Sequence, residues 1–202
     1  MRRRRTGSET EPPGAEASVE IAARFLGTRP RSRWEVERRL RRAGASDQII
    51  EGTLDHLAGL GLVDDLAFAR WWVEQRDRHA PRGRRLVEAE LREHGVGRDV
   101  IEMLRDDLAA LETRAHDSSG APGAERGEDV ELPISEAERA RIALVQHLRG
   151  RPLPGDRRAL QRLGMFLIRR GFDPDTARST LRAAEDADPD TGTDAAAPPE
   201  PE

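Results

Sequence analysis

Leu40-Arg-Arg-Ala-Gly44 is the first of three copies of a short pattern, which returns as Leu91-Arg-Glu-His-Gly95 and as Leu167-Ile-Arg-Arg-Gly171. In each copy a leucine stands four residues before a glycine, at the end of a stretch with apolar side chains at helical spacing. Glycine commonly ends an α-helix because it adopts the left-handed conformation without strain. A unit that recurs along a chain indicates a repeat architecture. The pattern therefore predicts three units, each with a helix stopped by glycine, a short turn and a further helix.

The spacing of apolar side chains on either side of these glycines predicts nine helices, and no stretch shows the sustained alternation typical of a strand. The predicted helices cover 18–28, 33–43, 47–60, 65–79, 83–94, 98–111, 136–149, 157–170 and 174–184. Capping boxes at Ser32 and Ser135, and Asp173 followed by proline, mark three of the helix starts. Three sets of three helices predict an all-α fold, an elongated array of three tandem three-helix repeats.

The segments outside the repeats are predicted to be disordered, because they lack the large apolar side chains that would offset the entropy of ordering. Repeats are predicted at 18–62, 63–111 and 135–184, with a basic and polar arm at 1–17, an acidic flexible insert at 112–134 and an acidic tail at 185–202. Because the insert separates the second and third repeats, repeats one and two are expected to form a fixed pair. Repeat three is expected to hang from a flexible joint.

The residue composition excludes several classes of site. The chain has 202 residues and no cysteine, and all 34 of its basic residues are arginine. The absence of cysteine excludes disulfides and thiolate chemistry, and the absence of lysine excludes the Gly-x-x-x-x-Gly-Lys phosphate loop. The histidines are scattered without ligand-like spacing, so no metal site and no cofactor are predicted; they are His56, His79, His94, His116 and His147. No convergent catalytic set is found, so we expect a protein that is not an enzyme.

The beginning of the chain and its hydropathy bear on localisation. Met1 is followed by four arginines but by no apolar stretch, as a secretory signal would require. No run of residues approaches the ~20 apolar residues that span a bilayer. A cytoplasmic protein without membrane contact is therefore predicted.

Charge is strongly segregated, although the formal net charge is only -4. Residues 139–183 hold 11 arginines against 3 acidic residues, whereas residues 184–202 hold 7 acidic residues and no arginine. The acidic tail is therefore predicted to screen the arginines from non-specific nucleic acid.

Arginine clusters give the candidate binding residues, because the planar guanidinium suits phosphate and carboxylate groups. Two strong clusters surround 29–42 and 76–85, and a weaker set lies at 149–170. The alternative is a set of solvated helix faces paired with Glu35, Glu37, Glu88, Glu90 and Glu93. The run 81–85 in the second cluster contains no acid, which favours the binding interpretation there. The predicted partner-binding residues are Arg31, Arg33, Arg38, Arg39, Arg42, Arg76, Arg78, Arg82, Arg84, Arg85, Arg169 and Arg170.

For an aspartate pair and for the tryptophans, we prefer a structural role to a binding or catalytic one. Asp64 and Asp65 are expected to cap a helix and to place charge in its first turn, rather than to bind metal. The tryptophans Trp34, Trp71 and Trp72 are expected to pack rather than to stack on bases.

The same segments resemble the RecX family, bacterial regulators of the recombinase RecA. The run 31–40 (RSRWEVERRL) is similar to the family's opening motif, and 61–69 (GLVDDLAFA) is similar to its "GL-I/V-DD-x-x-FA" signature. Residues 83–96 (GRRLVEAELREHGV) and 167–172 (LIRRGF) resemble two further motifs in the same order. The motif residues expected to be structural are Gly44, Gly61, Asp64, Asp65, Phe68, Gly83, Gly95 and Gly171.

The resemblance implies a modular array of three-helix repeats that binds RecA, particularly in the helical groove of the RecA–DNA filament. It implies modulation, most often inhibition, of filament extension, ATP hydrolysis and strand exchange in recombination, DNA repair and the SOS response. The expected protein is a monomer without an activity of its own. The alternative reading is a helical-repeat module that binds DNA directly through an arginine stripe.

Overall fold

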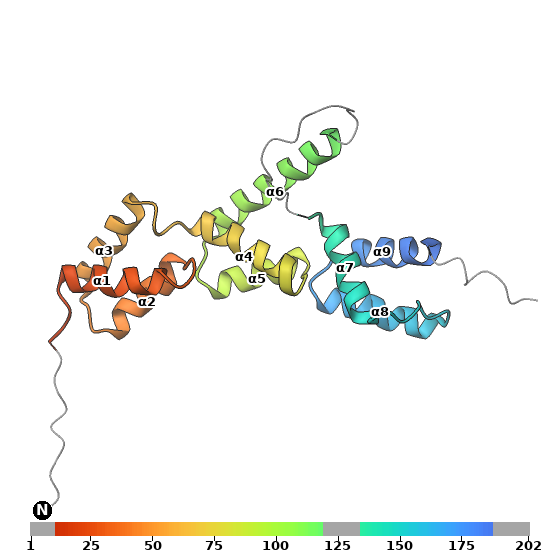
Figure 1. Cartoon of the computed structure of the whole chain (residues 1–202), viewed down its shortest axis with the longest axis horizontal. Helices are drawn as coiled ribbons and strands as arrows, with labels where there is room; N and C mark the ends of the chain where they lie inside the picture. The colour runs from red at the N-terminus through yellow and green to blue at the C-terminus, as the bar shows by residue number, and fades with distance from the viewer. Residues whose placement is uncertain (1–10, 119–133, 188–202) are drawn as a thin grey trace, which may run out of the picture. The chain divides into compact units, whose positions relative to one another are not determined.

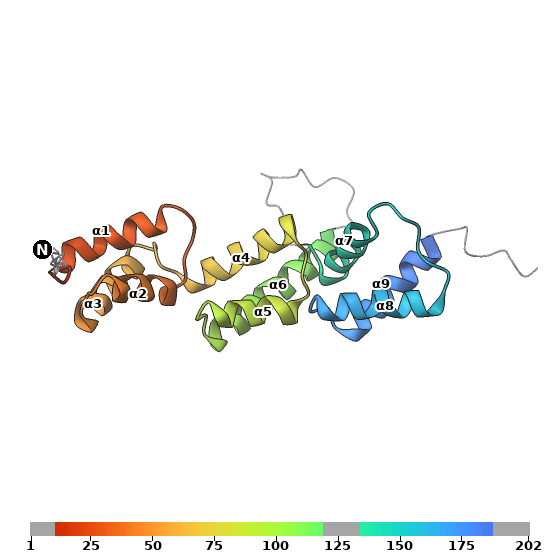
Figure 2. The same cartoon turned by 90° about the horizontal axis from the view of Figure 1, so that it is seen from below.

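The computed structural model describes residues 11–118 and 134–187, and every regular element in them is an α-helix (Figures 1 and 2). This confirms the predicted all-α fold. The helices are α1 (Ala15–Leu26), α2 (Arg33–Arg42), α3 (Asp47–Gly59), α4 (Asp65–His79), α5 (Arg84–Glu93), α6 (Arg98–Ser118), α7 (Glu136–Leu148), α8 (Arg157–Arg169) and α9 (Pro174–Ala187).

The chain divides into two compact units. Unit 1 comprises Met1–Trp71 and Leu91–Leu104, and unit 2 comprises Trp72–Glu90 and Arg105–Glu202. The residues of α4, α5 and α6 are thus shared between the units, and the boundary falls between two adjacent tryptophans. The three repeat ranges stay a prediction. The basic run at the start of the chain, the centre of the acidic insert and the end of the acidic tail lie outside the described residues.

The core of unit 1 lies between α1, α2 and α3, which all contact one another. Ala22 from α1, Val36 and Leu40 from α2 and Leu57 from α3 are fully buried in it or nearly so. Burying each of the larger side chains, Val36, Leu40 and Leu57, contributes about 1.5–3 kcal/mol to folding. The amphipathic spacing that predicted these helices is therefore the spacing that fills this core.

In unit 2, α7, α8 and α9 also contact one another and enclose a core of their own. Leu167 and Phe172 are fully buried with Ala140 and Ala177 around them. A second cluster joins Leu163 on α8 to Leu144 and Leu153, with Leu160 and Ala184 packed against it. The end of α9 therefore packs beside the beginning of α8.

The three pattern glycines end helices as predicted, because each adopts a positive φ: 88° at Gly44, 75° at Gly95 and 89° at Gly171. After each glycine the next amide donates a hydrogen bond back to the pattern leucine: Ala45 to Leu40, Val96 to Leu91 and Phe172 to Leu167. This is the Schellman arrangement, which satisfies a carbonyl that the helix leaves open.

Three helices are longer than predicted. α1 begins at Ala15, after Gly14, so the predicted disordered arm is helical at its end. α6 continues to Ser118, into the predicted insert, and α9 continues to Ala187. In all three places neither glycine nor proline interrupts the added residues, and extending an existing helix is favourable once its first turn has formed.

Candidate partner-binding surface

Asp64 and Asp65, predicted as the cap and the first-turn charge of one helix, have different roles. Asp64 caps α4, since its Oδ1 accepts hydrogen bonds from the amides of Leu66 and Ala67 at 2.8 and 3.0 Å. Asp65 instead accepts a hydrogen bond from the Arg33 amide at 2.7 Å and so ties the start of α2 to the start of α4. Burial raises the pKa of Asp65, although the bond from Arg33 partly opposes this rise. Asp65 therefore acts as a tertiary tether rather than only as a first-turn charge.

The turn after α5 is fixed against α2 within unit 1. The Ser32 hydroxyl, which caps α2 in the predicted capping box, also donates to the His94 carbonyl at 2.6 Å. A Cβ on Gly95 would lie 2.4 Å from the Cβ of Trp34, which is closer than any real contact. Phe68 is buried, 5.6 Å from the His94 ring. Gly95 is thus required both by its backbone conformation and by this close approach.

Within the first arginine cluster, the side chains nearest the helix start are held internally. Arg29 donates to Glu35 at 2.7 Å, and Arg31 lies 3.7 Å from the same carboxylate and 4.0 Å from the Phe25 ring centre. Arg33 pairs with Asp55 at 2.9 Å.

Further along α2, Arg38 stacks over Trp34, with 4.4 Å between the guanidinium carbon and the ring centre. Arg39 and Arg42 are exposed, and their side chains make no hydrogen bond or ion pair with the described residues. At the start of this cluster the arginines therefore pair with acids of the same unit. Arg39 and Arg42 remain available to bind a partner.

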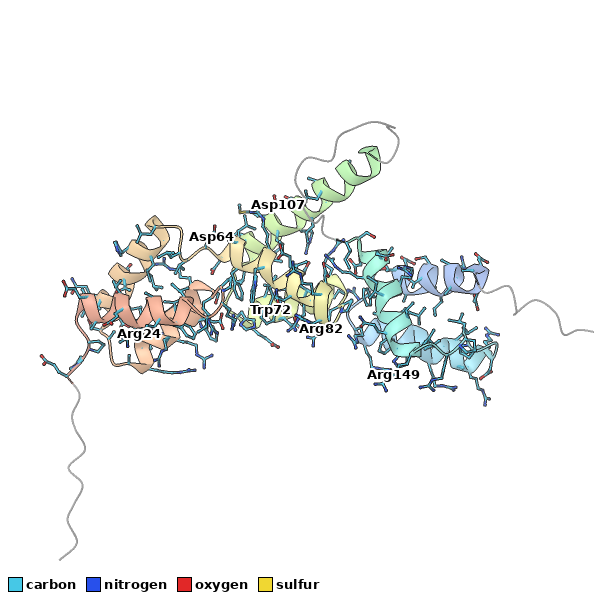
Figure 3. All side chains as sticks on the ribbon, in the orientation of Figure 1. Arg24, Asp64, Trp72, Arg82, Asp107 and Arg149 are labelled. Atoms are coloured by element: carbon cyan, nitrogen blue, oxygen red, sulfur yellow. The ribbon has the colours of Figure 1, made fainter. Side chains whose placement is uncertain are left out.

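In the second cluster, the Glu90 carboxylate of α5 contacts three donor side chains of unit 2, two of which, Trp72 and Arg82, are labelled in Figure 3. Its carboxylate accepts from Trp72 Nε1 at 2.9 Å and from Arg76 Nε at 2.7 Å, and it pairs with Arg82. Burial lowers the pKa of Arg82, and the charges of Arg76 and Arg170 lower it further. The expectation that this acid-free run leaves its arginines unpaired is wrong for Arg82, because the acid comes from the next helix.

Two more pairs connect the beginning of α5 and the end of α4 to α7. Arg84 lies 3.2 Å from Glu136. Arg139 donates to both oxygens of Asp77, at 2.6 and 3.0 Å, and only 7% of its side chain is exposed. Sequence reasoning missed this pair, since its partners are far apart in the chain.

The loop before α5 crosses the turn between α8 and α9 at van der Waals distance. The Gly83 amide donates to the Arg170 carbonyl at 2.9 Å, and a Cβ on Gly83 would lie 2.2 Å from the Gly171 carbonyl carbon. The Arg170 side chain reaches the Pro81 carbonyl at 3.3 Å. The loose attachment expected for the third repeat therefore differs from the structure, in which 72–90 and α7–α9 form one unit.

The weakest cluster of the sequence is the most exposed in the structure. Six of its arginines are exposed, and their side chains make no hydrogen bond or ion pair with the described residues; they are Arg149, Arg151, Arg157, Arg158, Arg162 and Arg169. Arg158, Arg162 and Arg169 project from one face of α8 and line a hollow of about 560 Å³ with Gln161 and Met165. We call these three residues the α8 arginine face.

The two remaining candidates, Arg78 and Arg85, are exposed. Arg85 lies near enough to Asp173 to help lower the pKa of that carboxyl, although the hydrogen bonds from Thr176 are the larger cause. Gly61, the last of the predicted structural residues, turns the chain after α3 with φ at 68°.

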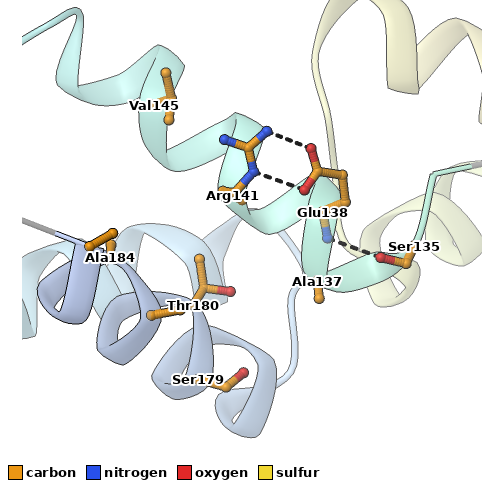
Figure 4. Close-up of a pocket in the computed structure, with 10 residues that line it drawn as sticks. Ser135, Ala137, Glu138, Arg141, Val145, Ser179, Thr180 and Ala184 are labelled. Carbon is orange, nitrogen blue, oxygen red and sulfur yellow. Dashed lines mark hydrogen bonds and ion pairs between the residues drawn. The ribbon is translucent and has the colours of Figure 1, made fainter.

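A second hollow in unit 2, of about 620 Å³, lies between α7 and α9 (Figure 4). Ala137, Val145 and Ala184 make most of its lining apolar, and the two charged residues at its edge neutralise each other. Arg141 donates to both oxygens of Glu138, at 2.8 and 2.6 Å. This hollow suits an aliphatic contact rather than acid–base chemistry.

The described residues, 11–118 and 134–187, include no group of three or more histidines and acids placed to hold a metal ion. In the same ranges, no helix combines the length and the apolar character that crossing a membrane requires.

Comparison with known proteins identifies the family of this chain. A model of the first three-helix domain of RecX matches residues 19–57, and a model of the second matches residues 64–103. Regulatory protein RecX from Mycobacterium avium (strain 104) is 34% identical over 176 residues, which cover 87% of this chain and 89% of that protein. The chain belongs to the RecX family.

Other RecX proteins extend the comparison. The regulatory protein RecX of Thermobifida fusca (strain YX) is 39% identical over 114 residues, which cover 52% of this chain and 60% of that protein. The crystal structure of RecX from Lactobacillus salivarius matches with a TM-score of 0.64 and 16% identity, over 85% of this chain and 96% of that one. A second crystal structure, of a regulatory protein RecX, matches with a TM-score of 0.60 and 19% identity. At these identities the structures support the fold.

Proposed function

We propose that this RecX-family protein is a non-enzymatic, cytoplasmic regulator that binds the recombinase RecA in the groove of the RecA–DNA filament. Bound there as a monomer, it inhibits filament extension, ATP hydrolysis and strand exchange in recombination, DNA repair and the SOS response. The observation that carries the proposal is membership of the RecX family over 87% of the chain. No cofactor takes part.

The pairing of the arginines narrows the proposed contact residues. Arg31, Arg76 and Arg82 are held by internal carboxylates, so they shape the fold rather than reach a partner. The residues proposed to reach RecA are exposed, and their side chains make no hydrogen bond or ion pair with the described residues: Arg39, Arg42, Arg85 and Arg169. Several such contacts along one protein can add up to firm binding without a single dominant residue.

The direct test adds purified protein to preformed RecA filaments on single-stranded DNA and follows ATP turnover. Turnover should fall in proportion to the ratio of protein to RecA protomers. Unchanged turnover at saturating protein would refute the proposal.

Direct DNA binding is a second candidate, and the unpaired α8 arginine face favours it. The two candidates differ in their response to salt. A protein held by several phosphate contacts loses orders of magnitude in affinity for naked DNA between about 50 and 200 mM salt, because it releases counterions on binding. Inhibition through RecA should instead follow RecA stoichiometry over that range.

A further inference from the structure

The α8 arginine face lacks a counter-charge among the described residues. Its nearest acids in sequence are already used: Asp156 accepts from the amides of Arg158 and Ala159, at 3.1 and 3.2 Å. On α9, Asp173 caps the helix and Asp175 pairs with Arg178. The three cations therefore repel one another across one helix face without a neutralising group beside them.

The chain carries the missing charge at its own end. Residues 188–202 contain five acidic residues and no basic one; the acids are Asp188, Asp190, Asp194, Glu200 and Glu202. Exposed guanidinium groups bind carboxylates in planar, two-bond geometry, so the acids and the α8 arginine face are chemically matched.

The path from α9 to this surface is short. Ala184, near the end of α9, packs in the same cluster as Leu160 on α8. α9 therefore ends near the part of α8 that carries Arg158 and Arg162. Fifteen residues reach up to about 50 Å when extended, whereas the 13 residues of α8 are about 20 Å long. The segment is therefore long enough to reach every residue of the α8 arginine face. Because it is tethered to α9, its acids are held at millimolar effective concentration near that face.

We propose that the α8 arginine face is an anion-binding surface whose occupant is the acidic segment 188–202 of the same chain. The segment binds as an extended polyanion, with its carboxylates on Arg158, Arg162 and Arg169. A phosphate backbone must displace it before using these cations. The interaction requires neither RecA nor DNA, and it shares only Arg169 with the residues proposed to reach RecA.

The absence of cysteine allows a direct test in the full-length protein, since Ala197→Cys introduces a single thiol for a nitroxide label. Paramagnetic relaxation of the backbone amides of α8 and α2 is then measured. Enhanced relaxation is expected in α8 and not in α2. It should fall at least twofold in the double variant Arg158→Gln/Arg162→Gln, whose glutamines preserve helix propensity. The matched variant Arg39→Gln/Arg42→Gln removes two exposed arginines of α2 and should leave the relaxation unchanged.

Affinity for a short oligothymidylate, measured without RecA, supplies a second readout. Deleting 188–202 should raise the affinity about threefold to tenfold at 50 mM salt, and the gain should shrink at 300 mM because salt screens exposed charges. In the Arg158→Gln/Arg162→Gln background the same deletion should change affinity less than about twofold, since the two changes remove one interaction.

Relaxation of α8 that is the same with and without the two arginines overturns the proposal. If the arginines are then still needed for oligothymidylate binding, the face is a nucleic-acid surface that the tail does not occupy. Because RecA is absent from both measurements, failure of this proposal leaves the proposed RecA contact at Arg39, Arg42 and Arg85 unaffected.

Discussion

Arg139 of α7 and Asp77 of α4 form a two-bond ion pair in which the arginine side chain is nearly fully buried. Burial raises the pKa of Asp77, and the bonds from Arg139 oppose that rise. Losing the arginine would leave the carboxylate desolvated without a partner. The pair therefore stabilises unit 2 chiefly because Arg139 offsets the cost of burying the Asp77 carboxylate.

Replacing Arg139 with alanine should lower the free energy of unfolding by about 3 kcal/mol, because the partner charge stays buried. The double change Arg139→Met/Asp77→Leu should cost clearly less, because it removes both charges. Urea denaturation followed by circular dichroism measures both. As a control, Glu102→Gln breaks an exposed pair with Arg98 and should change stability by at most about 0.5 kcal/mol.

Gly95 and Gly44 occupy the same position in two helix ends but have different surroundings. Gly95→Ala should cost about 3 kcal/mol or more, because left-handed strain adds to the collision with Trp34. Gly44→Ala should cost only about 1–2 kcal/mol, since the Cβ of the new alanine would have its nearest neighbour, on Pro13, at 4.0 Å. If the two variants lost the same stability, the Trp34 side chain would have moved aside from the new Cβ at no cost in free energy.

Asp65→Asn should raise stability at neutral pH. The folded pKa of Asp65 is raised by burial, so its charged form destabilises the fold above that pKa. The destabilisation disappears as the pH falls through the raised pKa towards the ordinary value of 3.8. Asparagine cannot ionise and still accepts the bond from Arg33. The variant's advantage in thermal unfolding should therefore be present at pH 7 and absent near pH 3.

Charge reversal at Arg82 should mainly affect stability, whereas charge reversal at Arg85 should mainly affect inhibition of RecA. Arg82→Glu places a second carboxylate beside Glu90 and should destabilise unit 2 by about 2 kcal/mol or more. Arg85→Glu, on the exposed side, should change the melting temperature only slightly, through its weak interaction with Asp173, and should weaken inhibition of RecA ATP turnover. An Arg85→Glu protein that inhibits fully would remove this residue from the proposed contact set.

Local signals in the sequence predicted most of the fold. Gly44, Gly95 and Gly171 end helices because a turn within a few residues decides their conformation, and Ser32 and Asp64 cap helices for the same reason. Helix ends without a glycine or proline were predicted too short, as α6 shows. Residues that are common inside helices also occur at helix ends, so they do not show where a helix stops.

The charged surface was harder to predict, because pairing is decided between helices. Glu90 is one of five acids predicted as possible partners of the arginines, but nothing in the sequence singles it out as the shared partner of Trp72, Arg76 and Arg82. The run that looked free of acids is thus partly neutralised, whereas the weaker cluster on α8 is exposed. Counting charges along the chain measures how many cations there are and not how many can reach a partner.

The boundary between the adjacent Trp71 and Trp72 has an optical consequence. The chain has no tyrosine and three tryptophans, so its near-ultraviolet fluorescence comes from indoles, with Trp34 and Trp71 reporting on unit 1 and Trp72 on unit 2. A chain that keeps only Trp72 would emit from an indole bonded to Glu90, and its spectrum would report the melting of that unit alone. Two neighbouring residues thus supply separate intrinsic probes for the two halves of the protein.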